Sequence, residues 1–357
     1  MTIQMNSYFR TAIYEMDGYV PGEQPKERQY IKLNTNENPY PPSANVVSAL
    51  SALDPADFRR YSDPVSDDLR DAAAEAFGVT RNDIIAGNGS DDILTIAIRS
   101  FVEQGGAIAT VDPTYSLYPV LAQIQGATTI AVPLAEDFSL PDQLLDTIQG
   151  ADMLFIARPN APTGNIYPLA DMERICEIFE GIVFIDEAYA DFSQNNCLHF
   201  ASRFDNAIVS RTLSKSYSLA GLRVGFGIAH PEIISGMMKV KDSYNLSRIS
   251  QALGAAALRD PDYLRETLCR VIATRNRVTR GLEALGFQVV PSETNFVFAK
   301  PPVATPANEL FTKLRDGGIL VRYFGGSPKT REYIRVTIGT DDEMTRFLET
   351  TRRLVTP

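Results

Sequence analysis

The feature that most constrains the fold of this chain is an alternation of short apolar segments with helical patterns between residues 107 and 229. Apolar side chains recur at helical spacing over 117–125 and 171–179, between segments short enough to be strands. This order predicts an α/β fold, in which a mostly parallel sheet is sandwiched by helices. The predicted strands are Ala107–Val111, Thr128–Leu134, Met153–Ala157, Ile182–Asp186, Ala207–Leu213 and Val224–Ala229.

The pattern changes after residue 229. A long helical region, predicted over 232–285, is followed by short strand-like segments mixed with helical ones. This predicts a second, smaller α+β domain, which the N-terminal segment and the C-terminal third form together. We predict an N-terminal arm over 1–30, a small domain over 31–53 and 255–357, and a large domain over 54–254. The later strands are predicted at 287–290, 296–299, 320–323 and 333–338, and the later helices at 307–315 and 342–354.

Sheets of this type bind ligands at the carboxyl ends of their strands. The residues that follow each predicted strand are therefore the first place to look for a site. They form the stretches 112–115, 158–164, 186–189 and 210–223.

The stretch 210–223 carries one lysine, Lys215, among small hydroxyl residues, and Arg223 follows eight positions later. A lysine at the exit of a strand is held in one place and can form a Schiff base. The hydroxyls around Lys215, with the Arg223 guanidinium, are suited to a phosphate. This combination suggests pyridoxal 5′-phosphate (PLP). The alternative is a surface loop with a single lysine.

Three further side chains at strand ends suit the same cofactor. Asp186 ends an apolar strand, and a carboxylate there can keep the pyridine nitrogen of PLP protonated. Tyr189 follows three residues later and can donate to the phenolate oxygen of the ring. Tyr115 follows another strand and offers a flat face for stacking. The alternative makes Asp186 a cap and both tyrosines half-buried packing residues.

A glycine-rich turn, Gly87-Asn88-Gly89-Ser90-Asp91, leads into a predicted helix with one apolar face. Such a turn exposes unpaired backbone N–H groups at the positive end of the helix dipole, which is an anion site. Its alternative role is simple helix capping by Ser90 or Asp91.

Composition excludes several classes of protein. The net charge of −10 argues against a nucleic-acid binder. The polar N-terminus lacks the apolar core of a signal peptide, and no apolar run approaches ~20 residues, so no membrane span is expected. Two histidines, His199 and His230, leave little material for a histidine metal site or a Ser-His-Asp triad, and no metal is expected.

The cysteine pattern predicts a reducing, cytoplasmic location. The chain has an odd number of widely spaced cysteines, with neither a disulfide framework nor a CxxC metal motif. They are Cys176, Cys197 and Cys269.

Together these motifs resemble the fold-type I PLP-dependent aminotransferases, and most of all their histidinol-phosphate aminotransferase branch within class I/II. The resemblance runs over nearly the whole chain, from Leu33-Asn34-Thr35-Asn36-Glu37-Asn38-Pro39-Tyr40 to Ile334-Arg335-Val336-Thr337-Ile338-Gly339-Thr340. Its most specific parts are the Lys215 stretch with Arg223 and the pair formed by Asp186 and Tyr189.

The resemblance implies a role for each matching residue. Lys215 would be the Schiff-base lysine and then the base that moves the α-proton, with Asp186 and Tyr189 as its catalytic partners. Tyr61 would reach the phosphate of a partner subunit's PLP, which implies a homodimer. The other residues implied at the cofactor are Gly89, Ser90, Asp91, Tyr115, Asn160, Thr212, Ser214 and Arg223. Those implied at the substrate are Tyr19 in the arm, Asn36, Arg322 and Arg335, where Arg335 would bind an anionic group and Arg322 is typical of the phosphate-substrate branch.

The chain departs from the family pattern at one position. The family usually places an asparagine directly before Pro-Thr-Gly, in contact with the phenolate oxygen, whereas this chain has Ala161 preceded by Asn160. Asn160, a water or Tyr189 alone would then make this contact. Losing one hydrogen bond to the phenolate would tend to raise the pKa of the imine.

The function that the resemblance implies is transamination between L-histidinol phosphate and glutamate/2-oxoglutarate. A guanidinium fork accepts phosphate and carboxylate alike, so Arg322 and Arg335 suit both substrates. The alternatives are an aromatic or broad-specificity aminotransferase, a PLP decarboxylase of a phosphorylated amino acid, and a PLP-binding regulator without catalysis. This acidic chain has no residues to spare for the DNA-binding domain that such regulators usually carry.

Overall fold

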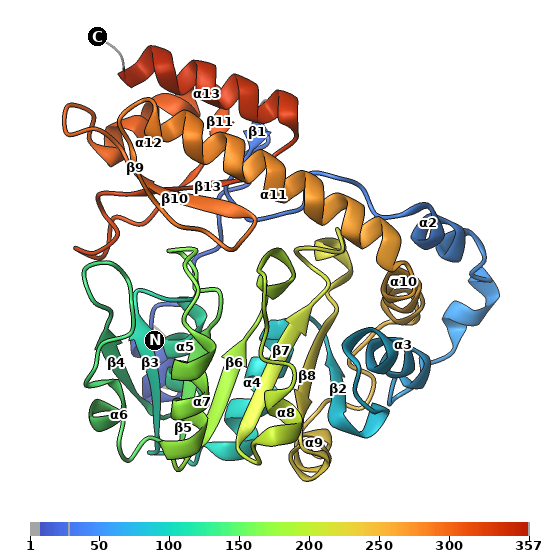
Figure 1. Cartoon of the computed structure of the whole chain (residues 1–357). Helices are drawn as coiled ribbons and strands as arrows, with labels where there is room; N and C mark the ends of the chain where they lie inside the picture. Colours follow the sequence, from blue (N-terminus) through green and yellow to red (C-terminus); the bar gives the residue numbers. More distant parts are fainter. Residues whose placement is uncertain (1–7, 28, 356–357) are drawn as a thin grey trace, which may run out of the picture.

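A seven-stranded sheet forms the larger part of the molecule (Figure 1). The computed structural model describes residues 8–27 and 29–355. Strands β3 to β7 run parallel to one another, whereas β8 is antiparallel to both of its neighbours, β7 and β2. In spatial order the strands are β2 (Ile84–Gly87), β8 (Gly225–Ala229), β7 (Ala207–Thr212), β6 (Ile182–Asp186), β5 (Met153–Ala157), β3 (Ala107–Asp112) and β4 (Thr128–Pro133).

Helices cover both faces of this sheet, because successive strand residues point to opposite sides. In β5, Leu154 and Ile156 pack in the cluster that contains α7, whereas Met153 and Phe155 pack in the cluster that contains α4 and α5. Buried apolar runs of this kind are typical of parallel strands. The helices associated with the sheet are α3 (Asp67–Phe77), α4 (Ser90–Phe101), α5 (Leu117–Gln125), α6 (Leu144–Thr147), α7 (Leu169–Ile178), α8 (Phe200–Arg203), α9 (Pro231–Met238) and α10 (Arg248–Leu258).

A second, antiparallel sheet lies over the carboxyl ends of these strands (Figure 1). Its order is β12 (Arg322–Tyr323), β13 (Ile334–Thr337), β10 (Phe296–Lys300) and β9 (Gln288–Val290). Helices α11 (Pro261–Glu283), α12 (Ala307–Asp316) and α13 (Asp341–Val355) pack around it and share its apolar core. The predicted fold class, a mostly parallel sheet with a separate α+β part, is confirmed.

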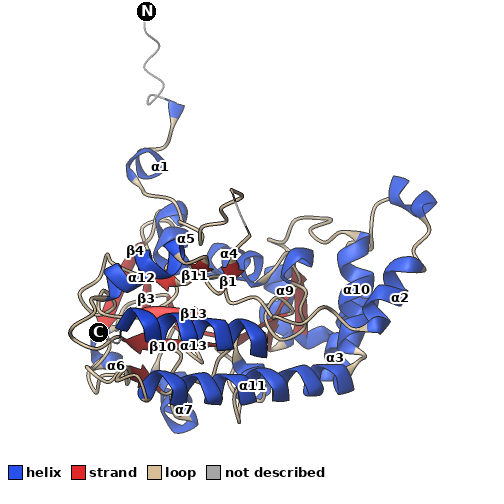
Figure 2. Ribbon diagram, turned by 90° about the horizontal axis from the view of Figure 1, so that it is seen from above, coloured by secondary structure: helices blue, strands red, loops and turns tan. Residues whose placement is uncertain are grey.

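The N-terminal segment joins this second part of the molecule. Strand β1 (Ile31–Lys32) pairs in parallel with β11 (Ile319–Leu320), and α2 (Ala44–Ser51) follows and packs on α10. The arm before β1 is largely extended, but it contains one short helix, α1 (Thr11–Glu15), which the sequence did not indicate and which packs near α5 (Figure 2). Short 3₁₀ turns lie at Pro55–Arg59, Arg81–Asp83, Ala190–Phe192 and Ala220–Leu222.

Two expectations from the sequence were wrong. The region 232–285 is not one helix but three, because Ser247 caps the start of α10 and Asp260 with Pro261 starts α11. The stretch 320–323 is not one strand, since β11 pairs with β1 whereas β12 pairs with β13 in the other sheet. In addition, β2 forms an edge of the large sheet that was not among the predicted strands.

Candidate active site

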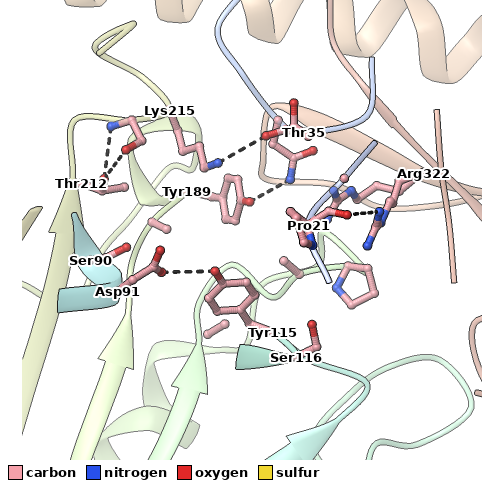
Figure 3. A pocket seen from close by; sticks show the side chains of 18 of the residues that line it. Pro21, Thr35, Ser90, Asp91, Tyr115, Ser116, Tyr189, Thr212, Lys215 and Arg322 are labelled. Carbon is pink, nitrogen blue, oxygen red and sulfur yellow. Dashed lines mark hydrogen bonds between the residues drawn. The ribbon is translucent and has the colours of Figure 1, made fainter. Parts of the chain in front are cut away.

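One cavity lies where the carboxyl ends of the large-sheet strands meet the second sheet and the N-terminal arm (Figure 3). It collects side chains that are far apart in sequence, as the strand-end argument predicts. The predicted site residues that line it are Tyr19, Asn36, Ser90, Asp91, Tyr115, Asp186, Tyr189, Thr212, Ser214, Lys215, Arg223, Arg322 and Arg335.

Lys215 reaches into this cavity from the turn that follows β7. Its Nζ donates to the backbone carbonyl of Thr35 at 3.5 Å and lies 5.8 Å from the centre of the Tyr189 ring. Neither contact involves a carboxylate, so the Lys215 amine forms no ion pair among the described residues. A lysine so placed is suited to react with a carbonyl group.

A cradle for an anion lies beside the lysine. Helix α4 begins after Gly89, which has φ +87° and provides no side-chain cap, so the first N–H groups of the helix point outward. The Arg223 guanidinium lies 3.3 Å from the Ser214 hydroxyl and 3.3 Å from an Asp91 carboxylate oxygen. Thr212 donates its hydroxyl to Ser214 at 3.0 Å. Backbone amides, hydroxyls and a guanidinium thus converge, as phosphate binding requires.

Close backbone packing shapes the same cradle. A Cβ atom on Gly225 would lie 2.4 Å from the carbonyl carbon of Gly89 and 2.4 Å from the nitrogen of Ser90. A Cβ on Gly89 would lie 2.4 Å from Nη2 of Arg223. Gly225 therefore needs to be glycine because backbone atoms approach it closely, whereas Gly89 needs to be glycine because of its positive φ.

Asp186 is buried at the end of β6 and is held by three donors. The Tyr118 hydroxyl donates to Oδ2 at 2.8 Å, and the Ser210 hydroxyl and the Ala188 backbone N–H each donate to Oδ1 at 3.1 Å. Burial raises the pKa of Asp186 above its usual value, although these hydrogen bonds oppose the shift. Burial also raises the pKa of the Tyr118 phenol, so this donor stays protonated.

Tyr115 stands on the wall formed by the turn after β3. Its hydroxyl donates to Asp91 at 3.2 Å, and its ring makes an edge contact with Tyr19 at a centroid distance of 5.9 Å. Burial raises the pKa of the Tyr115 phenol. An aromatic ring fixed in this way is suited to stack on a planar ligand.

Two arginines form the wall opposite the large sheet. Arg322 and Arg335 are direct partners across antiparallel strands β12 and β13. The Arg322 guanidinium donates to the carbonyls of Val20 at 3.1 Å and Pro21 at 3.2 Å, which ties the arm to the rim of the cavity. The Arg335 guanidinium donates to the Asn34 carbonyl at 3.1 Å, but its buried Nε has no hydrogen-bond partner within residues 8–27 and 29–355.

Among the residues that the structure describes, no carboxylate forms an ion pair with Arg322 or Arg335. Burial, and to a smaller degree the charge of Arg322, lowers the pKa of Arg335. Like charges directly opposite on a sheet are destabilising. An unpaired buried Nε and a facing positive charge indicate a site for an anion.

Three predicted residues do not line the cavity. Gly89 lies just behind it and makes room for Arg223, as described above. Asn160 is buried, and its amide is already bonded to the Pro113 carbonyl at 2.9 Å and the Thr163 hydroxyl at 2.7 Å, so its placement lends no support to contact with a cofactor. Tyr61 is 77% exposed on the outer surface and stacks on Tyr244 at 4.4 Å.

Asn36 lines the cavity, but its amide is engaged by protein groups. Its Nδ2 donates to the Tyr189 hydroxyl at 2.8 Å, and its Oδ1 accepts from the Thr337 hydroxyl at 3.0 Å. The side chain therefore has little capacity left for a substrate.

The sequence did not reveal several groups that the fold brings to the site. In the sequence, Tyr118 is one position in a predicted helix. The only signal for its role is that a buried phenol needs a hydrogen-bond partner, which the structure shows to be Asp186. A buried network also supports the lysine turn: Arg211 contacts Asp191 and donates to Glu187 at 3.0 Å, and Ser216 donates to Asp191. Arg158 lies 3.9 Å from Glu187 and belongs to the same network.

Known proteins are similar in sequence to this chain over most of its length. The family model for aminotransferase class I and II matches residues 28–350. A histidinol-phosphate aminotransferase of Rippkaea orientalis is 47% identical over 95% of this chain and 96% of its own length. Another protein of that name, from Crocosphaera subtropica, is 48% identical over 97% of this chain and 98% of its own length.

Solved structures show the same fold. The histidinol-phosphate aminotransferase of Sinorhizobium meliloti, solved in complex with pyridoxal-5′-phosphate, superposes with a TM-score of 0.89 at 27% identity and covers 98% of both chains. The aspartate aminotransferase of Thermus thermophilus with maleate, at 20% identity and a TM-score of 0.79, covers 92% of each chain and shares the fold. From the matched family model and the extent of these identities, the chain belongs to the class I and II aminotransferases.

Proposed function

We propose that this chain is a PLP-dependent aminotransferase that moves an amino group between L-histidinol phosphate and glutamate/2-oxoglutarate. The observation that carries the proposal is the facing pair Arg322 and Arg335, whose charges meet in the cavity that also contains Lys215. The names of relatives at 46–48% identity support the choice of substrate.

The residues present fit PLP. A phosphate suits the cradle of Ser90, Ser214 and Arg223, where the packing of Gly225 leaves no room for a side chain. Asp186 would face the pyridine nitrogen, and Tyr115 would stack on the ring. Lys215 would hold the cofactor covalently through its amine.

PLP, when bound, supplies an electron sink for the charge that develops at the α-carbon of the substrate. The protein supplies the rest. Asp186 is an ionisable group without a cationic partner among its hydrogen bonds, so its negative charge is available to a protonated ring nitrogen. We assign to Lys215 the transfer of a proton at the α-carbon, because its amine is the basic group that reaches the cavity from the same strand edge.

We assign the substrate anion to the two arginines. The Nε donor of Arg335 is unsatisfied in the described part of the chain, and Arg322 faces it from the neighbouring strand. A phosphate dianion requires more positive charge than a carboxylate, and two guanidinium groups supply it. Tyr19, from the arm, would close the site from above.

The test is a comparison of kcat/KM for histidinol phosphate, phenylalanine, tyrosine and phosphothreonine. We expect histidinol phosphate to be the best amino donor, with 2-oxoglutarate as acceptor. A better aromatic donor would make the chain an aromatic aminotransferase, and release of CO₂ from phosphothreonine would make it a decarboxylase. Borohydride reduction of the PLP-loaded protein, followed by peptide mapping, is expected to label Lys215. Full activity in Lys215→Ala would end the PLP assignment.

We further propose a homodimer in which Tyr61 reaches the partner's phosphate cradle. Tyr61 is exposed and lies outside the cavity of its own chain, and Val47, Leu50 and Phe58 are exposed apolar side chains in the same region of sequence. Sedimentation is expected to give a dimer, and Tyr61→Phe is expected to weaken PLP retention without changing the oligomeric state. A monomer that retains PLP fully would contradict this part of the proposal.

The division into an arm (1–30), a small domain (31–53 and 255–357) and a large domain (54–254) also stays a proposal. It is supported by the separation of the seven-stranded sheet from the four-stranded and two-stranded sheets. Among the described residues, no helix combines the length and apolar character needed to cross a bilayer. A cytoplasmic location is proposed on the ground that Cys176, Cys197 and Cys269 are all free thiols.

A further inference from the structure

Asn36 sits in the middle of a buried hydrogen-bond chain that joins three distant parts of the sequence. Its Nδ2 donates to the Tyr189 hydroxyl at 2.8 Å, a bond drawn in Figure 3, and the Thr337 hydroxyl donates to its Oδ1 at 3.0 Å. Asn36 and Thr337 are each 2% exposed. Asn36 follows β1, Tyr189 follows β6, and Thr337 ends β13.

The surroundings fix which way the Asn36 amide points. The Thr337 hydroxyl oxygen already accepts the backbone N–H of Asn36 at 3.0 Å. Its own proton needs an acceptor, and among the described residues its hydroxyl is bonded to Asn36 alone. The amide oxygen must therefore face Thr337, which leaves the amide NH₂ facing Tyr189.

This orientation decides what Tyr189 can do. A phenol oxygen can accept one hydrogen bond and donate another. Because Asn36 occupies the accepting side, the phenol proton is free to point into the cavity that Tyr189 lines. Accepting a hydrogen bond also strengthens the phenol as a donor, through the polarisation that runs along hydrogen-bond chains.

We infer that Asn36 and Thr337 are positioning residues that aim the Tyr189 proton at the ring oxygen of the cofactor. The inference rests on the proposed function. It also changes the role of Asn36 from substrate binding to the orientation of Tyr189. The side chain at Ala161 has no donor, so the Tyr189 phenol carries this contact without the family's usual asparagine.

The competing explanation is that Asn36 only stabilises a turn. Its φ is +56°, a conformation that asparagine tolerates, and the Asn295 side chain donates to its backbone carbonyl at 2.9 Å. A turn role predicts effects on stability alone. A positioning role predicts effects on the cofactor that depend on the Tyr189 hydroxyl.

The test is a double-mutant cycle. Its readout is the midpoint, the pH at which the visible absorbance of the PLP-loaded protein is halfway through its change, which reports the pKa of the imine. Asn36→Gly removes the amide while keeping the positive φ accessible, and Tyr189→Phe removes the phenol. We expect Tyr189→Phe to raise the midpoint by about one pH unit, as expected when a hydrogen bond to a charged oxygen is lost. Asn36→Gly is expected to raise it by roughly half as much in the parent and not at all in the Tyr189→Phe background.

Thr337→Val and Asn295→Ala complete the design. Thr337→Val releases the amide and is expected to raise the midpoint in the same direction as Asn36→Gly. Asn295→Ala removes the bond to the backbone carbonyl of Asn36 and is expected to lower Tm without moving the midpoint. The other ionisable groups around Tyr189, namely Lys215, Arg335, Tyr115 and Tyr118, are unchanged in every variant.

Two results would overturn the inference: an unchanged midpoint in Asn36→Gly, or an equal shift in the parent and in the Tyr189→Phe background. Failure of the proposed function looks different. In that case the parent protein would keep no visible absorbance after free PLP is removed by gel filtration, and borohydride would not label Lys215.

Discussion

Arg322 and Arg335 lie directly opposite each other on antiparallel strands, with no carboxylate bonded to either guanidinium among the described residues. Sheets normally avoid such like-charged partners. The pair is therefore a local cost to the empty protein that a bound anion relieves. Its effect should appear in ligand binding more than in folding.

Arg322→Gln should separate these two effects. We expect the free energy of unfolding of the ligand-free protein to stay within about 1 kcal/mol of the parent, because repulsion is lost together with the bonds to the arm. The rise in Tm caused by inorganic phosphate should shrink, and kcat/KM for histidinol phosphate should fall roughly 10- to 100-fold. The fall for glutamate should be smaller. Equal losses for both substrates would contradict the argument that the phosphate dianion depends on the second guanidinium more than a carboxylate does.

Asp186→Asn should abolish most activity while making the cofactor-free protein more stable at neutral pH. We expect kcat to fall roughly 100-fold or more, since a neutral amide cannot pair with a protonated ring nitrogen. Tyr118→Phe, which removes one hydrogen bond to Asp186, should cost about tenfold or less.

The gain in stability that we expect for cofactor-free Asp186→Asn depends on pH. Burial raises the pKa of Asp186 in the folded protein, so the folded state binds this proton more tightly than the unfolded chain does. Stability is therefore lost as pH rises from the unfolded pKa, about 3.9, through the folded one. The gain in Tm of cofactor-free Asp186→Asn should be absent near pH 3 and should grow as the pH is raised above the unfolded pKa. A gain independent of pH would refute this account.

Glu187→Gln should destabilise the protein strongly. Glu187 is fully buried between Arg211 and Arg158. Neutralising it leaves Arg211 with one carboxylate, Asp191, and leaves the buried Arg158 without an ion-pair partner among the described residues. We expect the free energy of unfolding to fall by about 3–5 kcal/mol, the usual cost of breaking a buried ion pair. Urea unfolding of the cofactor-free protein would measure this change. The matched control is Glu173→Gln, which breaks the exposed pair with Arg203 and should change stability by less than about 1 kcal/mol.

Gly225→Ala should damage the anion cradle through packing. Its methyl group would overlap the backbone at Gly89 and Ser90, so we expect a loss of about 1–3 kcal/mol in unfolding free energy and roughly tenfold weaker PLP binding. Gly236, in α9, has no neighbouring atom within 4 Å of an added Cβ. Gly236→Ala should therefore raise stability by about 0.5–1 kcal/mol and leave PLP binding unchanged. Similar PLP affinities in the two variants would contradict the packing argument.

The sequence predicted the large sheet well because its strands are continuous apolar runs, a pattern that is visible without knowledge of the partners. Strands β5 and β6 have the predicted bounds, and β7 differs by one residue. The strand-end rule then located Lys215, Asp186 and Tyr115 in one cavity.

Pairings between distant segments were not visible. Leu320 and Arg322 belong to different sheets only because β1 returns to pair with β11, which no local pattern shows. The roles of Tyr118 and Thr337 were not visible in the sequence either, because each is hydrogen-bonded to a residue more than 60 positions away. Hydrogen bonds of this range depend on the finished fold.

The pairing of β1 with β11 has a consequence for how the protein is made. Residues 31–36 leave the ribosome early, but their partners at Ile319, Leu320 and Thr337 are translated nearly 300 residues later. The wall that holds Lys215 can therefore assemble on the nascent chain before the wall that holds Asn36 and Arg335. It follows that stable cofactor retention is a property of the completed chain, and C-terminal truncation before residue 337 should yield a polypeptide that cannot keep PLP.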